Sequence, residues 1–251
     1  MIEEYPSLKD GLTLDFLLQK CTTIMPRYYT IASSSLAYPE ELHIAISMSL
    51  WTMPDKTTRY GMASEFVKDL FKQMQENKEQ TWTVKSFIKD SNFVMPASTE
   101  TPIVCVGPGT GVVPFIGFLQ ERSKQKELNP DVKLGSAQLF FGCREKDTDF
   151  IYRDYLADCA DKKILSELHL AFSRPDTTKE PEAKKQYVQH LLEEKIDEVL
   201  RLLKEENGTF YICGATKMGN EVQALLKEKL GQDYFKSMQT DKRLLVELWS
   251  S

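Results

Sequence analysis

Three glycines within five residues, Gly107, Gly109 and Gly111, separate the apolar run 103–106 from a segment that begins near Pro114 and has a helical pattern. Glycines in such a turn let the backbone bend sharply and keep side chains away from a ligand. Proline fits the first turn of a helix, where its missing N–H costs nothing. The amides and the positive end of that helix favour an anion, so the stretch predicts a site for a dinucleotide pyrophosphate.

A glycine-rich turn of this kind is not specific by itself. Its spacing is neither that of the GxGxxG fingerprint nor that of a phosphate-binding loop ending in GK[ST]. Thr110 adds a hydroxyl donor to the turn. The chemistry that the turn can support therefore depends on the elements around it.

The elements that would hold this turn alternate regularly after residue 102. Helical segments follow short apolar runs, and the longest carries apolar residues at a spacing of about 3.6. This order predicts a parallel sheet covered by helices on both faces, with ligands bound at the carboxyl ends of the strands. The expected strands are 103–107, 137–142, 168–173, 210–214 and 244–249, and the expected helices are 114–126, 149–158, 185–204 and 217–230.

The first hundred residues have a different pattern. We expect a helical lead-in over 1–25, strands at 28–33 and 43–50, and a helix over 63–75. The prolines and small polar residues just before residue 102 suit a linker. The expected domains are therefore 1–100 and 101–251.

The bulk composition excludes several classes of function. The formal net charge of -5 argues against nucleic-acid binding, because phosphate recognition usually goes with a basic face. No apolar stretch approaches the roughly 20 residues of a membrane-spanning helix. The three histidines lie far apart, so no metal site is predicted. The five cysteines form no CxxC pair, which is typical of reduced thiols in a cytoplasmic protein.

Eight segments of the chain occur in the order found in one family. Together they resemble the C-terminal half of diflavin reductases of the NADPH–cytochrome P-450 reductase type, over nearly the whole chain. That group includes the sulfite reductase flavoprotein, methionine synthase reductase and the reductase region of nitric oxide synthase. The segments are RYYTIASSS (27–35), GMAS (61–64), GPGTGVVPFIGFLQER (107–122), FFGCREKDTDFIYRDYL (140–156), AFSRPD (171–176), YVQHLL (187–192), YICGATKMGNEV (211–222) and ELWSS (247–251).

The resemblance implies an α/β fold in two parts. An antiparallel, ferredoxin–NADP reductase-like FAD-binding β-barrel precedes a doubly wound parallel-sheet NADP-binding domain. We expect only part of the barrel, because residues 1–20 resemble the tail of the family's helical connecting insert and the early barrel strands are not found. A truncated sequence, a split flavoprotein and a divergent module within a larger assembly remain open, and Val94 in place of a family-typical arginine favours divergence.

The resemblance places an FAD site in the first domain. Arg27 offers a permanently charged fork for the flavin diphosphate. Tyr29 would pack against the flavin ring, and Tyr28 offers an aromatic face or a phenol donor. Thr30 matches the position whose hydroxyl bonds to flavin N5, where the family usually has serine. Without the other motifs, the same segment also fits an amphipathic surface strand.

Two further segments are implied to line the same cofactor. Gly61 precedes a helical segment whose first amides would hold the FAD diphosphate. A plain capped helix is the alternative for that segment. Trp51 stands where an aromatic residue covers the cofactor in the family. The other members of the set are Ala45, Ile46, Ser47, Met62, Ala63 and Ser64.

The second domain is implied to bind NADPH rather than NADH. The ribose 2′-phosphate that distinguishes NADPH requires cationic and hydroxyl partners, and no acidic residue stands at the corresponding place. A solvated basic loop is the alternative for the cationic residues. Glu221 matches a position that usually carries aspartate and contacts the pyridine nucleotide. The expected 2′-phosphate set is Ser173, Arg174, Lys185, Tyr187 and Gln189, and the expected pyrophosphate set is Gly109, Thr110 and Gly111.

The expected hydride site combines Thr30, Cys213, Glu247 and Trp249. In the family the cysteine lies beside the nicotinamide carbon that gives up hydride, as a small contact group rather than a nucleophile. Trp249 would stack on the flavin and swing aside for nicotinamide, and Glu247, usually aspartate, would tune and relay protons. A buried cysteine and a core-packing tryptophan are the structural alternatives. Ala215 departs from the acidic residue that often follows the Cys-Gly pair.

These features together predict a flavoprotein reductase. NADPH would reduce FAD, and electrons would then pass to FMN on a flavodoxin-like domain or partner chain, or to a haem protein or another redox acceptor. A cytoplasmic location is expected, with attachment to the cytosolic face of a membrane through a missing N-terminal region as a variant. The competing hypothesis is a non-catalytic structural or interaction module that keeps the reductase fold.

Overall fold

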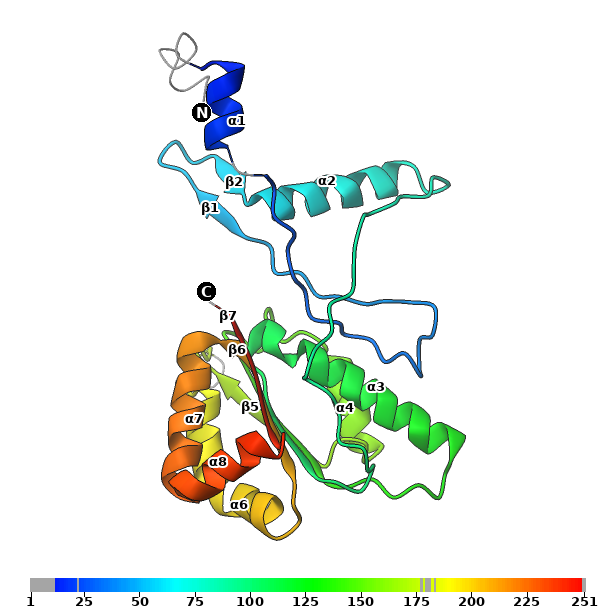
Figure 1. Cartoon of the computed structure of the whole chain (residues 1–251), viewed down its shortest axis with the longest axis vertical. Coiled ribbons are helices and arrows are strands. Elements are labelled where there is room, and N and C mark those ends of the chain that lie inside the picture. Colours follow the sequence, from blue (N-terminus) through cyan, green and yellow to red (C-terminus); the bar gives the residue numbers. More distant parts are fainter. Residues whose placement is uncertain (1–11, 22, 177, 179–181, 183, 250–251) are drawn as a thin grey trace.

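A five-stranded parallel sheet forms the centre of the second half of the chain (Figure 1). The computed structural model describes residues 12–21, 23–176, 178, 182 and 184–249. Within them the strand order is β5-β4-β3-β6-β7, and each neighbouring pair is parallel. The strands are β3 (Ile103–Val106), β4 (Ala137–Cys143), β5 (Glu167–Phe172), β6 (Thr209–Ala215) and β7 (Leu244–Trp249).

Helices cover both faces of this sheet, as the alternation predicts. Side chains of a strand point alternately to opposite faces, so Val104 and Phe210 join one buried cluster while Cys105 and Tyr211 join the other. The first cluster packs under α5 (Val188–Glu194), α6 (Ile196–Lys204), α7 (Thr216–Leu230) and α8 (Gln232–Thr240). The second packs under the short 3-10 helix η2 (Gly109–Val112), α3 (Val113–Leu128) and α4 (Arg153–Asp161). The doubly wound architecture is therefore confirmed.

Two details of the helical layer differ from the sequence-based expectation. The single helix expected over 185–204 is wrong, because the chain breaks at Lys195 into α5 and α6. Leu192 before the break and Val199 after it belong to the same buried cluster, so the break does not interrupt the packing of this face. Helix α8 was not expected; it follows Gly231, whose positive φ of 84° reverses the chain after α7.

The first half of the chain holds α1 (Leu14–Lys20), α2 (Met62–Glu76) and a two-stranded antiparallel sheet of β1 (Leu50–Thr52) and β2 (Thr58–Tyr60). The helix expected over 63–75 is confirmed as α2. Residues 1–11 and 22 of the expected helical lead-in lie outside the described residues.

The strands expected at 28–33 and 43–50 are wrong as regular elements. Their backbones meet at the antiparallel bridge between Ile31 and Ile44 and at the 2.8 Å hydrogen bond from the Ala32 amide to the His43 carbonyl, and the His43 amide also donates to the Ser33 hydroxyl. Residues between α1 and β1 run down to α3 and return (Figure 1). Among the described residues, no neighbouring strand extends this pairing, which leaves an extended segment in place of a sheet.

The expected linker packs against the second half of the chain. The Phe93 ring lies 5.3 Å from the Tyr211 ring, measured between centroids, and the Tyr211 hydroxyl donates a 2.8 Å hydrogen bond to the Val94 carbonyl. The division into domains 1–100 and 101–251 stays a prediction. Within the described part of the chain, none of the helices combines the length and apolar character needed to cross a membrane.

Candidate functional site

The glycine-rich turn lies against the carboxyl end of β6. A Cβ placed on Gly111 would lie 2.1 Å from the Cys213 carbonyl oxygen, and one placed on Gly107 would lie 2.4 Å from the Gly111 carbonyl oxygen. Real Cβ atoms do not approach oxygen this closely, so glycine is required at both positions. The turn therefore joins the end of β3 to the end of β6, two neighbouring strands of the sheet.

The same turn presents its middle glycine to open space. Gly109 has a φ of 56°, and a Cβ there would meet nothing within 4 Å. Pro114 lies in the first turn of α3, directly after η2. A backbone that is open at the start of a helix suits an anionic group such as a pyrophosphate. The residues Gly109, Thr110 and Gly111 thus fit the dinucleotide role expected for them.

The pairing of β6 with β7 brings together three of the four expected residues of the hydride site, all except Thr30. Cys213 lies opposite Glu247 in the register, and Ala215 lies opposite Trp249. Cys213 is completely buried, and Trp249 packs against the cluster that contains it. The Thr216 hydroxyl donates a 3.0 Å hydrogen bond to the Trp249 carbonyl, which fixes the end of β7 against the start of α7.

The surroundings of Cys213 and Glu247 raise the pKa of both groups. Burial raises the pKa of the Cys213 thiol, and the nearby Glu247 carboxylate raises it further. Burial also raises the pKa of Glu247. A thiol held in its neutral form is a poor nucleophile, because the thiolate is the reactive species. The site therefore fits a cysteine that makes contact rather than one that attacks.

The expected 2′-phosphate residues come from two segments joined at the end of β5. The amide of Gln186 donates a 3.0 Å hydrogen bond to the Phe172 carbonyl, which places the residues around 186 beside those that follow β5. On that side, the Arg174 amide bonds to the Arg144 carbonyl at 2.8 Å. Lys185 lies over the Tyr187 ring, with its Nζ 5.1 Å from the ring centroid.

Ser173 and Gln189 complete the expected set. The Ser173 amide donates a 3.0 Å hydrogen bond to the Cys143 carbonyl at the end of β4. Gln189 Nε2 donates a 2.7 Å hydrogen bond to the Glu221 carboxylate, which links α5 to α7. Glu221 was expected to contact the pyridine nucleotide, and here it lies beside another member of the expected cofactor set.

The expected flavin residues lie on the extended segment after α1. Arg27 donates from Nη1 to the Met25 carbonyl at 2.7 Å, and Thr30 is half-buried. The Tyr28 ring meets the Phe87 ring edge-on, with centroids 6.0 Å apart. Tyr29 is 38% exposed. Tyr29 and Trp249 lie on different segments of the chain, and a flavin held between them stays a prediction.

The second expected flavin segment, 61–64, lies at the start of α2, where the Ser64 side chain and the backbone amides have different partners. Ser64 is buried, and its hydroxyl accepts a 2.8 Å hydrogen bond from the Ser49 amide, so this side chain holds α2 to the chain before β1. The first intrahelical bond runs from the Glu65 amide to the Gly61 carbonyl. The amides of Met62, Ala63 and Ser64 precede that bond and suit a phosphate oxygen.

The remaining expected flavin residues precede α2 in the chain. Trp51, on β1, is 50% exposed and lies opposite Arg59 of β2. Ala45, Ile46 and Ser47 follow the Ile31–Ile44 bridge in an extended segment. An exposed indole beside an extended backbone is compatible with cofactor contact. Their roles remain predictions.

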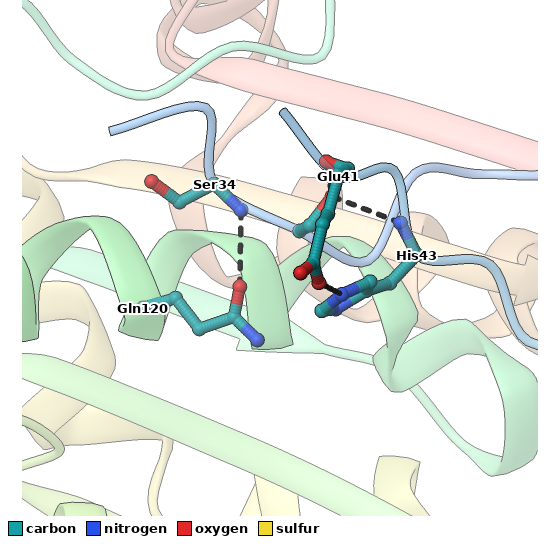
Figure 2. Close-up of polar contacts among 5 residues, drawn as sticks. Ser34, Glu41, His43 and Gln120 are labelled. Carbon is teal, nitrogen blue, oxygen red and sulfur yellow. Dashed lines mark hydrogen bonds and ion pairs between the residues drawn. The ribbon is translucent and has the colours of Figure 1, made fainter. Parts of the chain in front are cut away.

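Sequence reasoning missed a polar contact that joins the two halves of the chain (Figure 2). The Ser34 amide donates a 3.0 Å hydrogen bond to Gln120 Oε1, and the Ser34 hydroxyl donates to the Glu121 carboxylate. Both partners lie on α3. The segments SSS (33–35) and QER (120–122) were visible as motifs, but 86 residues separate Ser34 from Gln120, and sequence spacing carries no signal for such a pair.

Comparisons with known proteins identify two domain matches along the chain. Residues 1–66 match the FAD binding domain, and residues 105–224 match the oxidoreductase NAD-binding domain. The chain is 36% identical to the NADPH–cytochrome P-450 reductase of Musca domestica, over 94% of this chain and 35% of the relative. It is 35% identical to the methionine synthase reductase of Mus musculus, over 98% of this chain and 38% of the relative.

A third relative, the NADPH–cytochrome P-450 reductase of Sus scrofa, is 33% identical over 100% of this chain and 37% of its own length. The chain thus spans little more than a third of the curated relatives that it matches. The FAD binding match precedes the NAD-binding match along the chain, which is the order expected from the sequence. The chain belongs to the NADPH–cytochrome P-450 reductase-type family of diflavin reductases, of which it carries FAD-binding and NAD(P)-binding parts.

Proposed function

We propose that this chain is the part of a flavoprotein reductase that oxidises NADPH and reduces FAD. When bound, NADPH supplies a hydride, and FAD accepts it and releases the electrons to an acceptor. The observation that carries the proposal is the meeting of the Gly111 turn with Cys213, opposite Glu247, at the carboxyl edge of the sheet. That edge is where parallel α/β sheets bind their ligands.

Each group at this edge has a distinct task in the proposal. The open backbone at Gly109 and the start of α3 would hold the pyrophosphate. Cys213 presents a small, neutral side chain at the end of β6, and because it is completely buried, a planar ring would reach it only after a covering group such as Trp249 swings aside. Glu247 would tune and relay protons beside it, and burial raises the pKa of this carboxyl. Trp249 would cover the flavin face.

The cofactor choice rests on the residues after β5. Arg174 and Lys185, with Ser173, Tyr187 and Gln189, would contact the 2′-phosphate, which favours NADPH over NADH. The hydrogen bond between Gln186 and Phe172 supports this, because it brings the two cationic segments together. Glu221 would contact the pyridine nucleotide from α7.

The electron acceptor is inferred from the names of the relatives. Relatives are named for cytochrome P-450 and for methionine synthase, so we propose that electrons leave through FMN on a flavodoxin-like domain or partner chain toward a haem protein or another redox protein. A cytoplasmic location, or the cytosolic face of a membrane, is proposed with it. The matches to reductases weigh against the alternative of a non-catalytic structural module.

A spectrum tests the proposal directly. Purified chain supplied with FAD is expected to retain a flavin absorbance band, and NADPH is expected to bleach it without oxygen present. NADH should bleach it more slowly. A chain that binds neither FAD nor NADPH, even when supplied with the preceding part of a family member, would contradict the proposal and favour the structural module.

A further inference from the structure

Helix α3 carries a docked loop from the first half of the chain, residues 32–43. Ala32 and Ser34 are 1% and 5% exposed, although most of the segment around them is open to solvent. A Cβ on Gly117 would lie 3.5 Å from backbone atoms of Ala32 and Ser33, so the loop backbone lies directly on the helix. The two hydrogen bonds of Ser34 to Gln120 and Glu121 hold it there.

The loop itself is closed by its own hydrogen bonds. The Ser34 hydroxyl accepts from the amides of Leu36 and Ala37, each at 3.1 Å. At its other end, the His43 amide donates to the Ser33 hydroxyl at 3.0 Å, and His43 Nε2 lies 2.9 Å from the Glu41 carboxylate (Figure 2). The loop can therefore act as one unit, because its two ends are joined to each other and to α3.

Two of the expected flavin segments, 27–30 and 45–47, lie directly before and after this loop in the chain. Thr30 precedes Ala32 by two residues, and Ala45 follows the Ile31–Ile44 bridge. The other end of α3 begins at the glycine turn that lies on Cys213. Along a helix that rises about 1.5 Å per residue, Gln120 lies only about 10 Å from Val113. One rigid helix thus connects the flavin side to the pyridine nucleotide side.

We propose that Ser34 is a positioning residue: its contacts with Gln120 and Glu121 fix the distance between the flavin-side segments and the turn at Gly111. The inference rests on the proposed function for its catalytic consequence but not for its geometry. Hydride transfer is sensitive to displacements of about 1 Å, which can cost on the order of a hundredfold in rate. A loop that slides on α3 would therefore slow transfer without removing either binding site.

The geometry can be measured without a cofactor. Spin labels at Thr58→Cys, on β2, and Lys217→Cys, on α7, report the distance between the two sides in a chain whose Cys21 and Cys143 are replaced by serine. The distance distribution is expected to be narrow in this labelled chain and to broaden in Ser34→Ala and Gln120→Leu. Gln120→Glu keeps an acceptor oxygen for the Ser34 amide, so the distance distribution in this variant should stay narrow. Ser35→Ala is the matched control, because Ser35 is exposed.

The catalytic consequence is measured by stopped-flow bleaching of the bound flavin. Ser34→Ala and Gln120→Leu are expected to lower the limiting rate about ten- to hundredfold, with the dissociation constants for NADPH and FAD within about twofold of the unaltered chain. Gln120→Glu should recover most of the rate. A residue that only stabilised the fold would change affinity and rate together.

Two results would overturn the inference. Unchanged distance distributions in Ser34→Ala and Gln120→Leu would show that the contact does not set the separation. Equal limiting rates in Ser34→Ala and Ser35→Ala would show that the separation does not govern transfer. If the chain binds no FAD, the proposed function fails, whereas the distance measurement still decides whether Ser34 positions the two sides.

Discussion

Gly111 lies against the carbonyl of Cys213 so closely that no side chain fits between them: a Cβ on Gly111 would be 2.1 Å from the Cys213 oxygen. This contact makes the glycine-rich turn and the end of β6 a single structural unit. Any displacement of one residue is transmitted to the other. The expected pyrophosphate site and the expected hydride site are therefore coupled through backbone contact rather than through a side-chain network.

Replacing Gly111 by alanine is expected to destabilise the protein. The added methyl must displace backbone, and overpacking of this kind typically costs about 1–3 kcal/mol. Urea unfolding followed by circular dichroism measures the free energy of unfolding. Gly117→Ala is the matched control: its Cβ would lie 3.5 Å from its neighbours, an ordinary contact, and alanine in a helix gains about 0.5–1 kcal/mol over glycine. Equal effects of the two substitutions would contradict the contact.

The cysteines of the folded chain should differ in their rates of alkylation. Cys21 is exposed and is expected to react first with iodoacetamide at pH 8. Burial, aided by the charge of Asp149, raises the pKa of Cys143 to about 11, which leaves about 0.1% thiolate at that pH. Cys105 and Cys213 are buried and should react only after unfolding. Mass spectrometry of the modified peptides measures this order, and rapid labelling of Cys213 in the folded chain would contradict its placement.

Glu247 should make stability depend on pH. Its pKa is raised by burial, so the folded state holds the proton more tightly than the unfolded chain does. Its charge therefore lowers stability above the folded-state pKa, and this cost disappears below the unfolded value of about 4.3. Glu247→Gln is expected to increase the free energy of unfolding at pH 7 and to change it little at pH 4. Glu40→Gln, at an exposed position, should have no effect at either pH; a gain from Glu247→Gln that is equal at both would refute the prediction.

Arg174 should control the choice between the two pyridine nucleotides. Loss of a charge-assisted hydrogen bond to phosphate costs about 1.5–3 kcal/mol, or about a 10- to 100-fold loss of affinity. Arg174→Ala is therefore expected to weaken NADPH binding by that factor and to leave NADH binding nearly unchanged, as measured by titration calorimetry. Lys133→Ala removes an exposed charge between α3 and β4 and serves as the control. Equal weakening of both nucleotides would place the 2′-phosphate elsewhere.

The parallel sheet could be predicted from the sequence because its strands are buried on both faces. Runs such as IVCV at 103–106 and YIC at 211–213 are continuously apolar, and helices separate them at regular intervals. Pairing of Cys213 with Glu247 follows from the same order, since consecutive parallel strands end at one edge. The break at Lys195 could not be predicted, because the apolar stripe continues through it.

The first half of the chain was less predictable for a physical reason. Apolar alternation at 28–33 and 43–50 is typical of strands, but a strand needs a neighbour, and the described chain supplies only the bridge at Ile31 and Ile44. The docking of Ser34 on α3 depends on a contact between distant residues and on a close approach at Gly117. Neither leaves a periodic pattern in the sequence.

The distribution of the core has a consequence for biosynthesis. Among the described residues, Ala32 is the only buried apolar side chain before Pro102, whereas Phe66, Phe71, Phe87 and others in that half remain exposed. Translation adds roughly 5–20 residues per second, so the first ninety residues emerge roughly 8–30 s before β7 is complete. The two buried clusters on the parallel sheet do not include these aromatic side chains, even when the sheet is complete. Binding of holding chaperones to these side chains should therefore continue after the sheet has formed, because the sheet does not cover them.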